Sequence, residues 1–384
     1  MRILEVVPVF SDPFGGPVTV VRSISKELAK RHDVTVYTTT ASDPKHDIKQ
    51  SEEEVNGYKV YYFSRNFKQL IYSDFFGQVN ISLSMRDAIK NHLKEFDVVH
   101  VHSYQQFPDI IVSFYANLYK IPYIVQVHGS LPKISRIFRK YLFDFFFGKR
   151  ILFNATKVIA LNEQEHRQYV EFGVSQDKIA IIPNSITPYN KKQYKKGTFR
   201  SMYNISNTEK VILYIGRIHE TKRLDLLVKA FAIINRSIKS KLIIIGPDDG
   251  YLKTMLDIIN QLHVSKDVMY LGYVNENIKF SAFRDSDVFV TPKYYGFPMT
   301  FLEACSMECP IITTSTELMW INQIGYIASQ NEYSLAESIY TILTNENINK
   351  VFKNNTKKII KQYESSVVSK KLESLYISIL NKKN

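Results

Sequence analysis

The chain has 384 residues, of which 45% are hydrophobic and 23% are charged. This is the composition of an ordinary globular protein, and the length excludes a single typical core and predicts two domains. The formal net charge of +13 indicates an anionic partner, such as nucleic acid, an anionic membrane surface or a phosphorylated substrate.

The first half alternates apolar runs with helical patterns. The run 3–8 is followed by Gly15-Gly16 and by a helical pattern over 18–31, which together form the first crossover of a doubly wound sheet. Further strands are predicted at 34–37, 98–101, 123–127, 158–161 and 179–182. We expect a Rossmann-like domain over residues 1–184.

After that domain the sequence becomes polar and aperiodic over 188–197, which indicates a linker. The second half then repeats the alternation. Its predicted strands are 211–215, 242–245, 269–271, 288–291 and 311–313, and its predicted helices are 223–238, 251–262, 299–308, 333–343 and 366–380. We predict a second Rossmann-like domain over 185–365 and a separate final helix within 366–384. The predicted fold class is α/β, with two doubly wound domains facing a cleft.

The two cysteines, Cys305 and Cys309, lie four residues apart on one predicted helix, so neither can join distant parts of the chain. A reduced, cytoplasmic setting fits best. The chain opens directly into a strand, and no run approaches ~20 apolar residues. We therefore expect neither a signal peptide nor a membrane span, and at most a peripheral membrane contact.

The stretch 288–313 reads as strand, tight loop, helix and strand. Because the first amides of a helix lack internal partners and carry the positive end of its dipole, the loop favours an anion. Glu303 lies about one turn inside the helix on an otherwise apolar segment, where an unpaired carboxylate would be costly to bury. We expect it to have a polar partner, and a sugar hydroxyl would serve.

Arg217 and Lys222 follow the first strand of the second domain. The carboxyl end of a strand is where an open α/β sheet holds its ligand. Arginine offers a planar fork and lysine a point charge, so the pair suits a diphosphate. The alternative is a solvated basic loop.

These motifs resemble the donor-site signature of family 4 glycosyltransferases, which are retaining enzymes of the GT-B fold. The residues that carry the resemblance are Gly15-Gly16, Val127-His128-Gly129, Ile182-Pro183-Asn184, Gly216-Arg217, Lys222, Asp225, Gly296-Phe297, Leu302-Glu303-Ala304 and Pro310. The resemblance covers essentially the whole chain. It implies that a nucleotide-sugar donor binds mainly to the second domain, that the acceptor binds to the first, and that the final helix crosses back to the first.

The resemblance also implies roles for individual residues. Arg217 and Lys222 would hold the donor diphosphate and neutralise the leaving nucleotide, and His128 would lie at the reacting sugar. Glu303 would take the ribose hydroxyls, and Gly16 would let backbone amides approach the phosphates. The expected donor-binding residues are Gly15, Gly16, Arg217, Lys222, Tyr295, Gly296, Phe297, Met299, Thr300 and Glu303, and the expected catalytic residues are His128, Arg217 and Lys222.

His102 ends a strand much as His128 does, which makes it a candidate for acceptor binding, although a histidine there is more often structural. The sequence departs from the family pattern at three positions. Tyr295 replaces a glutamate that normally contacts the transferred sugar, Glu308 replaces a glycine, and Ser185 replaces the glycine that often follows Pro-Asn. The tyrosine implies altered donor recognition or reduced activity.

Asp248-Asp249 has the form of a metal-binding aspartate pair, but a turn that caps the next helix explains the pair better. GT-B enzymes generally need no metal because protein cations stabilise the leaving phosphate, so we expect neither metal nor cofactor. Residues 131–150 combine basic and aromatic side chains with one acid. This pattern fits either a helix in a membrane interface or an amphipathic helix packed on the first domain, and the resemblance favours the membrane because many relatives use lipid-linked acceptors.

The expected function is that of a retaining, hexosyltransferase-type enzyme moving a sugar from a UDP- or GDP-type donor to a hydroxyl acceptor on a lipid-linked or growing glycan. The alternatives are a GT-B nucleotide-sugar epimerase and a non-catalytic sugar-nucleotide-binding protein. We do not expect a nucleic-acid partner, because the basic residues are scattered along the chain rather than gathered in one stripe.

Overall fold

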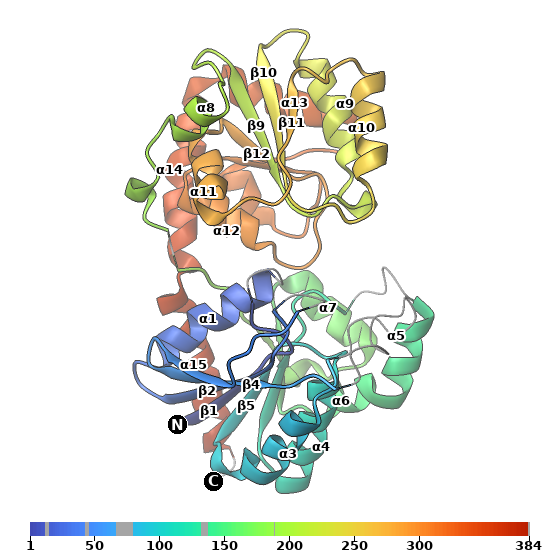
Figure 1. Cartoon of the computed structure of the whole chain (residues 1–384), viewed down its shortest axis with the longest axis vertical. Helices are drawn as coiled ribbons and strands as arrows, with labels where there is room; N and C mark the ends of the chain where they lie inside the picture. The colour runs from blue at the N-terminus through green and yellow to red at the C-terminus, as the bar shows by residue number, and fades with distance from the viewer. Residues whose placement is uncertain (12–14, 43–45, 67–79, 132–136, 188, 383–384) are drawn as a thin grey trace. The chain divides into compact units, whose positions relative to one another are not determined.

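The computed structural model describes residues 1–11, 15–42, 46–66, 80–131, 137–187 and 189–382 (Figure 1). The chain forms two compact units, each described here by itself. The first comprises Met1–Thr187 and Glu364–Asn384, and the second comprises Pro188–Tyr363. Each unit contains one mostly parallel sheet with helices on both faces, as the alternating apolar runs predict.

The first unit has an eight-stranded sheet in the order β3-β4-β2-β1-β5-β6-β7-β8. Its strands are β1 (Arg2–Val6), β2 (Asp33–Thr39), β3 (Glu52–Val55), β4 (Tyr58–Phe63), β5 (Val98–Val101), β6 (Tyr123–Gln126), β7 (Lys157–Ala160) and β8 (Ile179–Ile181). All neighbouring strands are parallel except β3 and β4. The sequence analysis missed this edge hairpin because three of the four residues of β3 are glutamates, and charged residues are how an edge strand avoids pairing with other chains.

Seven α-helices surround this sheet in the described residues. They are α1 (Gly16–Leu28), α3 (Leu83–His92), α4 (Phe107–Tyr119), α5 (Ile137–Phe143), α6 (Lys149–Asn154), α7 (Glu163–Phe172) and α15 (Ser365–Asn381). Several have clear local start signals. For example, Gln106 and Asp109 form a capping box at α4, and Asn162 caps α7.

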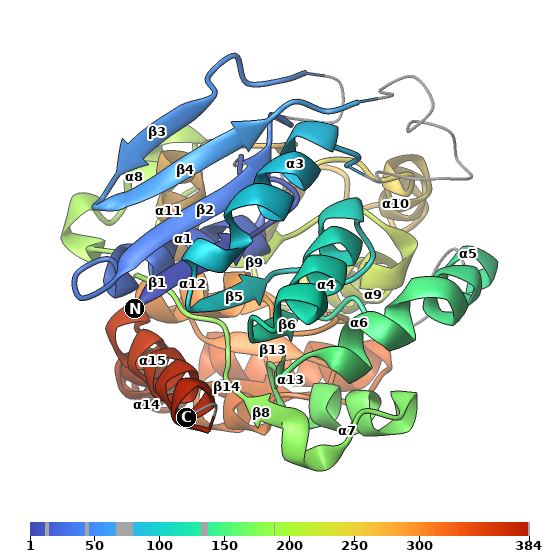
Figure 2. The same cartoon turned by 90° about the horizontal axis from the view of Figure 1, so that it is seen from below.

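The two faces of the first sheet differ in chemistry. Alternation along β1 and β5 turns Leu4 and Val99 into the hydrophobic core shared with α3, α4 and α6. Glu5 and His100 are partners in the parallel register of the two strands, and they point to the opposite face. The terminal helix α15 covers that face and packs against α1 (Figure 2), bringing Tyr376 within 2.7 Å of His100. A polar cluster is therefore buried beneath the last helix of the chain.

The second unit has a six-stranded parallel sheet in the order β11-β10-β9-β12-β13-β14. Its strands are β9 (Lys210–Ile215), β10 (Ser240–Ile245), β11 (Val268–Tyr270), β12 (Val288–Val290), β13 (Ile311–Thr313) and β14 (Gly325–Ile327). Its α-helices are α8 (Thr198–Met202), α9 (Leu224–Ile234), α10 (Leu252–Gln261), α11 (Glu276–Asp285), α12 (Met299–Ser306), α13 (Glu332–Thr344) and α14 (Glu346–Gln362). The sequence analysis missed β14, α8, α11 and α14.

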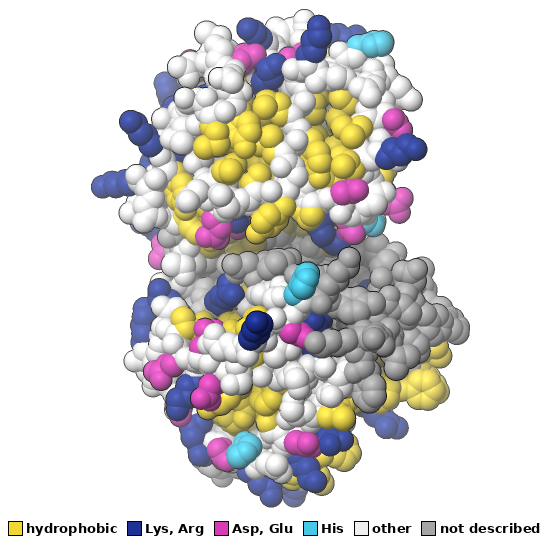
Figure 3. Space-filling view, viewed as in Figure 1, with side chains coloured by type: hydrophobic (Ala, Val, Ile, Leu, Met, Phe, Trp, Pro, Cys, Tyr) yellow, Lys and Arg dark blue, Asp and Glu magenta, His cyan; other side chains and the backbone are white. Residues whose placement is uncertain are grey.

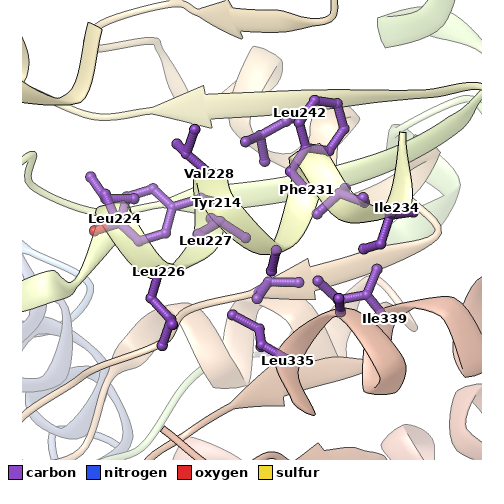
Figure 4. Close-up of a cluster of buried hydrophobic side chains, with 14 of the residues drawn as sticks. Tyr214, Leu224, Leu226, Leu227, Val228, Phe231, Ile234, Leu242, Leu335 and Ile339 are labelled. Atoms are coloured by element: carbon purple, nitrogen blue, oxygen red, sulfur yellow. The ribbon is translucent and has the colours of Figure 1, made fainter. Parts of the chain in front are cut away.

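One face of this second sheet forms a dense hydrophobic core with α9, α10 and α13. Tyr214 of β9, Phe231 of α9 and Leu335 of α13 interdigitate there (Figure 4). Burial of this size fixes β9 firmly, and so fixes the position of the loop that leaves its carboxyl end. No helix in the described part of the chain is long and apolar enough to cross a membrane.

Candidate functional site

The carboxyl ends of β9 and β10 carry two loops that touch closely. A Cβ built on Gly246 would lie 2.0 Å from the carbonyl oxygen of Gly216, so the loops approach as only glycine permits. Ile218 and Asp248 then form an isolated parallel bridge, which extends the pairing past the strands. The two loops therefore form one continuous rim, and Arg217 lies within it.

Arg217 and Asp249 form an ion pair across this rim, from Nη1 to Oδ2. Both side chains are exposed, at 65% and 40%, and such pairs contribute at most about 1 kcal/mol. The guanidinium can therefore exchange this carboxylate for a ligand phosphate at low cost. Asp248 accepts hydrogen bonds from the amides of the following turn, including that of Leu252 at 3.1 Å. Turn-forming and helix-capping geometry thus accounts for Asp248, as the sequence predicts.

Lys222 ends the 3₁₀ turn η6 (Glu220–Lys222) and is half-buried. Burial and the nearby charge of Arg217 lower the pKa of Lys222 to about 8. Among the described residues no carboxylate lies within ion-pair distance of its ammonium. A cation that is desolvated, beside another cation and without a counter-ion is disfavoured in the free protein, and an anion would relieve this cost.

The loop before α12 brings Tyr295 to these cations. Its ring centre lies 5.5 Å from Lys222 Nζ and 6.0 Å from Lys293 Nζ, within the range of cation–π attraction. The ring is 37% exposed. The structure therefore brings together Lys222 and Tyr295, which are 73 positions apart in the sequence.

The start of α12 offers backbone groups rather than side chains. Gly296 adopts φ +68, and α12 has no side-chain cap at its first residues. The Phe297 ring is buried against Tyr363, with ring centres 5.3 Å apart, and Met299 is also buried. These two predicted donor-binding residues can meet a ligand mainly through their main chain, while Thr300 is half-buried.

Glu303 has a partner that the sequence analysis did not identify. Lys279 of α11 donates to Glu303 Oε1 at 2.8 Å, and the carboxylate side chain is 9% exposed. A buried carboxylate needs such compensation. The expected polar partner is thus present as a lysine, whose spacing of 24 residues from Glu303 gave no local signal.

Two departures from the family pattern have structural explanations. Glu308 adopts φ +60, a conformation that glycine tolerates best, and its carboxylate pairs with Lys191 and Lys357. Ser185 is fully buried, and its hydroxyl lies 2.8 Å from that of Ser23 on α1. Each side chain forms a specific polar contact that glycine would not provide.

In the first unit, Gly15 and Gly16 stand at the start of α1. Gly15 adopts φ +76, a Cβ there would meet nothing within 4 Å, and no side chain caps the helix. Among the described residues, the predicted glycine turn therefore leaves space beside Gly15, as the approach of a ligand requires.

His128 lies just after β6 with φ +51, an uncommon conformation for a residue other than glycine. Its Nε2 lies 3.1 Å from Nδ1 of His102. The next residue is also fixed, because the Gly129 amide donates to Glu165 Oε1 at 2.7 Å. Burial raises the pKa of Glu165 to about 7, although backbone hydrogen bonds to the carboxylate oppose the rise. The two predicted histidines are therefore in direct contact.

The sequence analysis missed the groups behind these histidines. His102 Nε2 lies 2.6 Å from Oε2 of Glu5, which is completely buried. Glu5, His100 and His102 offer ligand atoms within 4.8 Å of one another. An ion bound to both Glu5 and His102 would hold their ligand atoms roughly 3 Å or more apart, so the 2.6 Å separation of these two atoms is that of a hydrogen bond.

Comparison with known proteins matches both halves of the chain. The family described as "Glycosyl transferase 4-like domain" matches residues 15–185, and the family described as "Glycosyl transferases group 1" matches residues 195–359. An uncharacterised glycosyltransferase of Methanocaldococcus jannaschii is 24% identical over 94% of each chain. The alpha-monoglucosyldiacylglycerol synthase of Acholeplasma laidlawii is 26% identical over 98% of each chain. The crystal structure of Anabaena Alr3699/HepE in complex with UDP has a TM-score of 0.76 at 14% identity, covering 98% of this chain and 100% of that one.

Proposed function

Because the chain belongs to the family 4 type of glycosyltransferases and has their GT-B fold, we propose that it is a retaining enzyme that uses a nucleoside diphosphate sugar, of the UDP or GDP type. The sugar passes to a hydroxyl acceptor on a lipid-linked or growing glycan. The proposal goes beyond the family assignment in naming the donor class, the stereochemistry and the acceptor.

The observation that carries the donor proposal is the state of Lys222. Its ammonium is half-buried beside Arg217, its pKa is lowered to about 8, and it faces an aromatic ring. A diphosphate supplies negative charge that both cations can share. Anabaena Alr3699/HepE, which has the same fold, was crystallised with UDP, and this supports a nucleotide ligand for this chain.

The chemistry we propose is electrostatic. As the bond from the sugar to the diphosphate breaks, negative charge grows on the leaving phosphate, and Lys222 and Arg217 stabilise that charge more strongly than in the ground state. Arg217 must first release Asp249. His128, in the first unit, is the residue that we assign to the reacting sugar, on the resemblance to the family. The cations do the work that a divalent metal does in other transferases.

The test is transfer of radiolabelled sugar from a panel of UDP- and GDP-sugars to lipid-linked acceptors. Arg217→Ala and Lys222→Ala should each lower the rate about 10²-fold or more, whereas Lys229→Ala, on the exposed face of α9, should not. Wild-type rates in both site variants would refute the donor site. Conversion of the free sugar nucleotide without transfer would instead identify an epimerase.

A second candidate function rests on Tyr295. The family pattern has a glutamate there, and a phenol cannot offset developing positive charge at the anomeric carbon as a carboxylate can. The alternative is a protein that binds sugar nucleotides without turning them over. Donor binding in a thermal-shift screen combined with no transfer to any acceptor would favour it.

We also propose that the acceptor is met at a membrane surface. The large hydrophobic side chains exposed on α5 and the π-helical turn η3 (Asp144–Gly148) are Tyr141, Leu142, Phe145, Phe146 and Phe147. Lys149 and Arg150 are exposed immediately after them. Hydrophobic side chains gather at the lower right edge of Figure 3, where Figure 1 places α5, with basic side chains close by.

Aromatic rings beside cations suit an anionic interface. The Acholeplasma laidlawii relative is itself named for a diacylglycerol product. Lys133, Arg136 and Arg139, which the sequence analysis included in this surface, lie outside the described side chains.

The membrane proposal is tested by cosedimentation with vesicles containing anionic lipid. Phe145 is 75% exposed, so Phe145→Ser combined with Phe146→Ser should weaken binding without harming the core. Tyr333→Ser is a matched control, since Tyr333 is 71% exposed in the second unit. Equal vesicle binding by the double variant and wild type, or none by either, would contradict the proposal.

A further inference from the structure

A continuous chain of hydrogen bonds joins Glu5 on β1 to His128. His102 forms both links: its Nε2 lies 2.6 Å from Glu5 Oε2, and its Nδ1 lies 3.1 Å from His128 Nε2. A neutral imidazole carries one proton on its two nitrogens. When His102 donates to one neighbour, it must therefore accept from the other, so the two hydrogen bonds cannot be oriented independently.

The other groups that face Glu5 come from β5 and α15. His100 Nδ1 lies 3.3 Å from Glu5 Oε2. The Tyr376 hydroxyl lies 3.4 Å from Glu5 Oε1 and 2.7 Å from His100 Nδ1. The remaining polar side chains against these rings are the neutral amides of Gln126 and Asn184. Within the described residues, Glu5 is thus the one carboxylate that contacts this group.

The titration behaviour of the group follows from its burial. Burial lowers the pKa of His102 and that of His128 to about 3, and the pKa of His100 also lies well below its ordinary value. Burial raises the pKa of Glu5 to about 7, against opposing effects of His100 and of the Tyr376 hydrogen bond. Near neutral pH the rings are therefore uncharged, and Glu5 is the member that gains or loses a proton.

The charge of Glu5 sets the direction of both bonds. An ionised carboxylate can only accept, so His102 donates from Nε2 and accepts at Nδ1. His128 then carries its proton on Nε2, and its Nδ1 is a bare acceptor. If Glu5 binds a proton on Oε2, it donates to His102 Nε2 and the order reverses, so that His128 Nδ1 carries the proton and becomes a donor.

We infer that Glu5 is a positioning residue, which acts through His102 to set whether His128 Nδ1 accepts or donates a hydrogen bond. The inference rests on the proposed function only in taking His128 as a sugar contact. Nδ1 is buried and has no hydrogen-bond partner by geometry among the described residues, so a group that reaches it meets an acceptor when Glu5 is ionised and a donor when Glu5 is protonated. Asn184 lies against the His128 ring and tolerates both states, because a side-chain amide both donates and accepts.

The test is ¹⁵N NMR of protein labelled in its histidine rings, which distinguishes protonated from bare ring nitrogens without any substrate. In the wild type, His128 Nδ1 should change from bare to protonated as the pH falls through about 7. Glu5→Gln should abolish this change between pH 5 and 9. Tyr376→Phe should move its midpoint to higher pH, because the lost hydrogen bond favours the ionised carboxylate.

A wild-type His128 whose tautomer stays the same from pH 5 to 9 would overturn the inference, as would a transition that persists in Glu5→Gln. If that variant does not fold, an unmoved midpoint in Tyr376→Phe overturns it equally. In an active enzyme, kcat for wild type should fall with protonation of Glu5 while the KM for donor changes less. An NMR transition without any sugar transfer would leave the relay standing and count against the proposed function alone.

Discussion

Lys222→Met should make the free protein more stable, although it removes a proposed binding group. Burial and Arg217 lower the pKa of Lys222 from its usual 10.5 to about 8, so folding disfavours the charged form. This cost is fully present below pH 8 and disappears as the pH rises from 8 to 10.5, where the unfolded chain binds more protons than the folded one. A methionine of similar length removes the charge at every pH.

The magnitude follows from the same values. The difference between 10.5 and about 8 corresponds to at most about 3 kcal/mol. Lys222 is only half-buried, so solvent screening reduces this figure. The variant also loses the cation–π contact with Tyr295, which contributes about 0.5–1 kcal/mol. A net stabilisation of about 1–2 kcal/mol should remain at pH 7.

Urea unfolding at pH 7 and pH 9.5 measures this effect, with Lys229→Met, at an exposed position of α9, as the control. Lys222→Met should raise the midpoint at pH 7 without changing the slope, and the gain should shrink at pH 9.5. Lys229 is exposed, so its variant should stay within about 0.5 kcal/mol of wild type. If Lys222→Met is no more stable than Lys229→Met at pH 7, the lysine is not held at a cost, and the argument for an anion site fails.

Tyr295→Glu should change the preferred donor or the turnover by about tenfold or more, since it places a carboxylate beside Lys222. Tyr295→Phe should have the smaller effect. Identical donor rankings and rates in wild type and both variants would place this residue outside the sugar site. Burial raises the pKa of Glu5 from 4.5 to about 7, so between these pH values the folded protein keeps a proton that the unfolded chain loses. The stability of wild type relative to Glu5→Gln should therefore fall by about 3 kcal/mol as the pH rises from 4.5 to 7. Urea titrations giving a constant difference would contradict that assignment. Glu308→Gly should be more stable than Glu308→Ala by about 1 kcal/mol. Both variants lose the ion pair with Lys191, and only glycine relieves the backbone strain at φ +60. Equal thermal midpoints would show that the backbone is not strained.

The local sequence was sufficient for the order of most strands and helices. Apolar runs such as 288–291 identify parallel strands because both faces of such a strand are buried, and glycines mark the turns between elements. The same reasoning located Arg217 and Lys222 at the end of β9, since the carboxyl ends of parallel strands share one edge of the sheet. It failed at β3, where an edge strand made mostly of glutamates has no apolar face to recognise.

The buried partners of the candidate residues were decided only by tertiary structure. Lys279 meets Glu303 because α11 and α12 pack together. Glu5 meets His102 because the register of β1 and β5 places Glu5 opposite His100, two residues before His102. Tyr376 joins them only because the last helix returns to the first unit. Hydrophobic periodicity reports which face of an element is buried, but it carries no information about which distant element covers that face. The sequence therefore determined which polar groups would need partners, and the packing of the whole unit determined which partners they have.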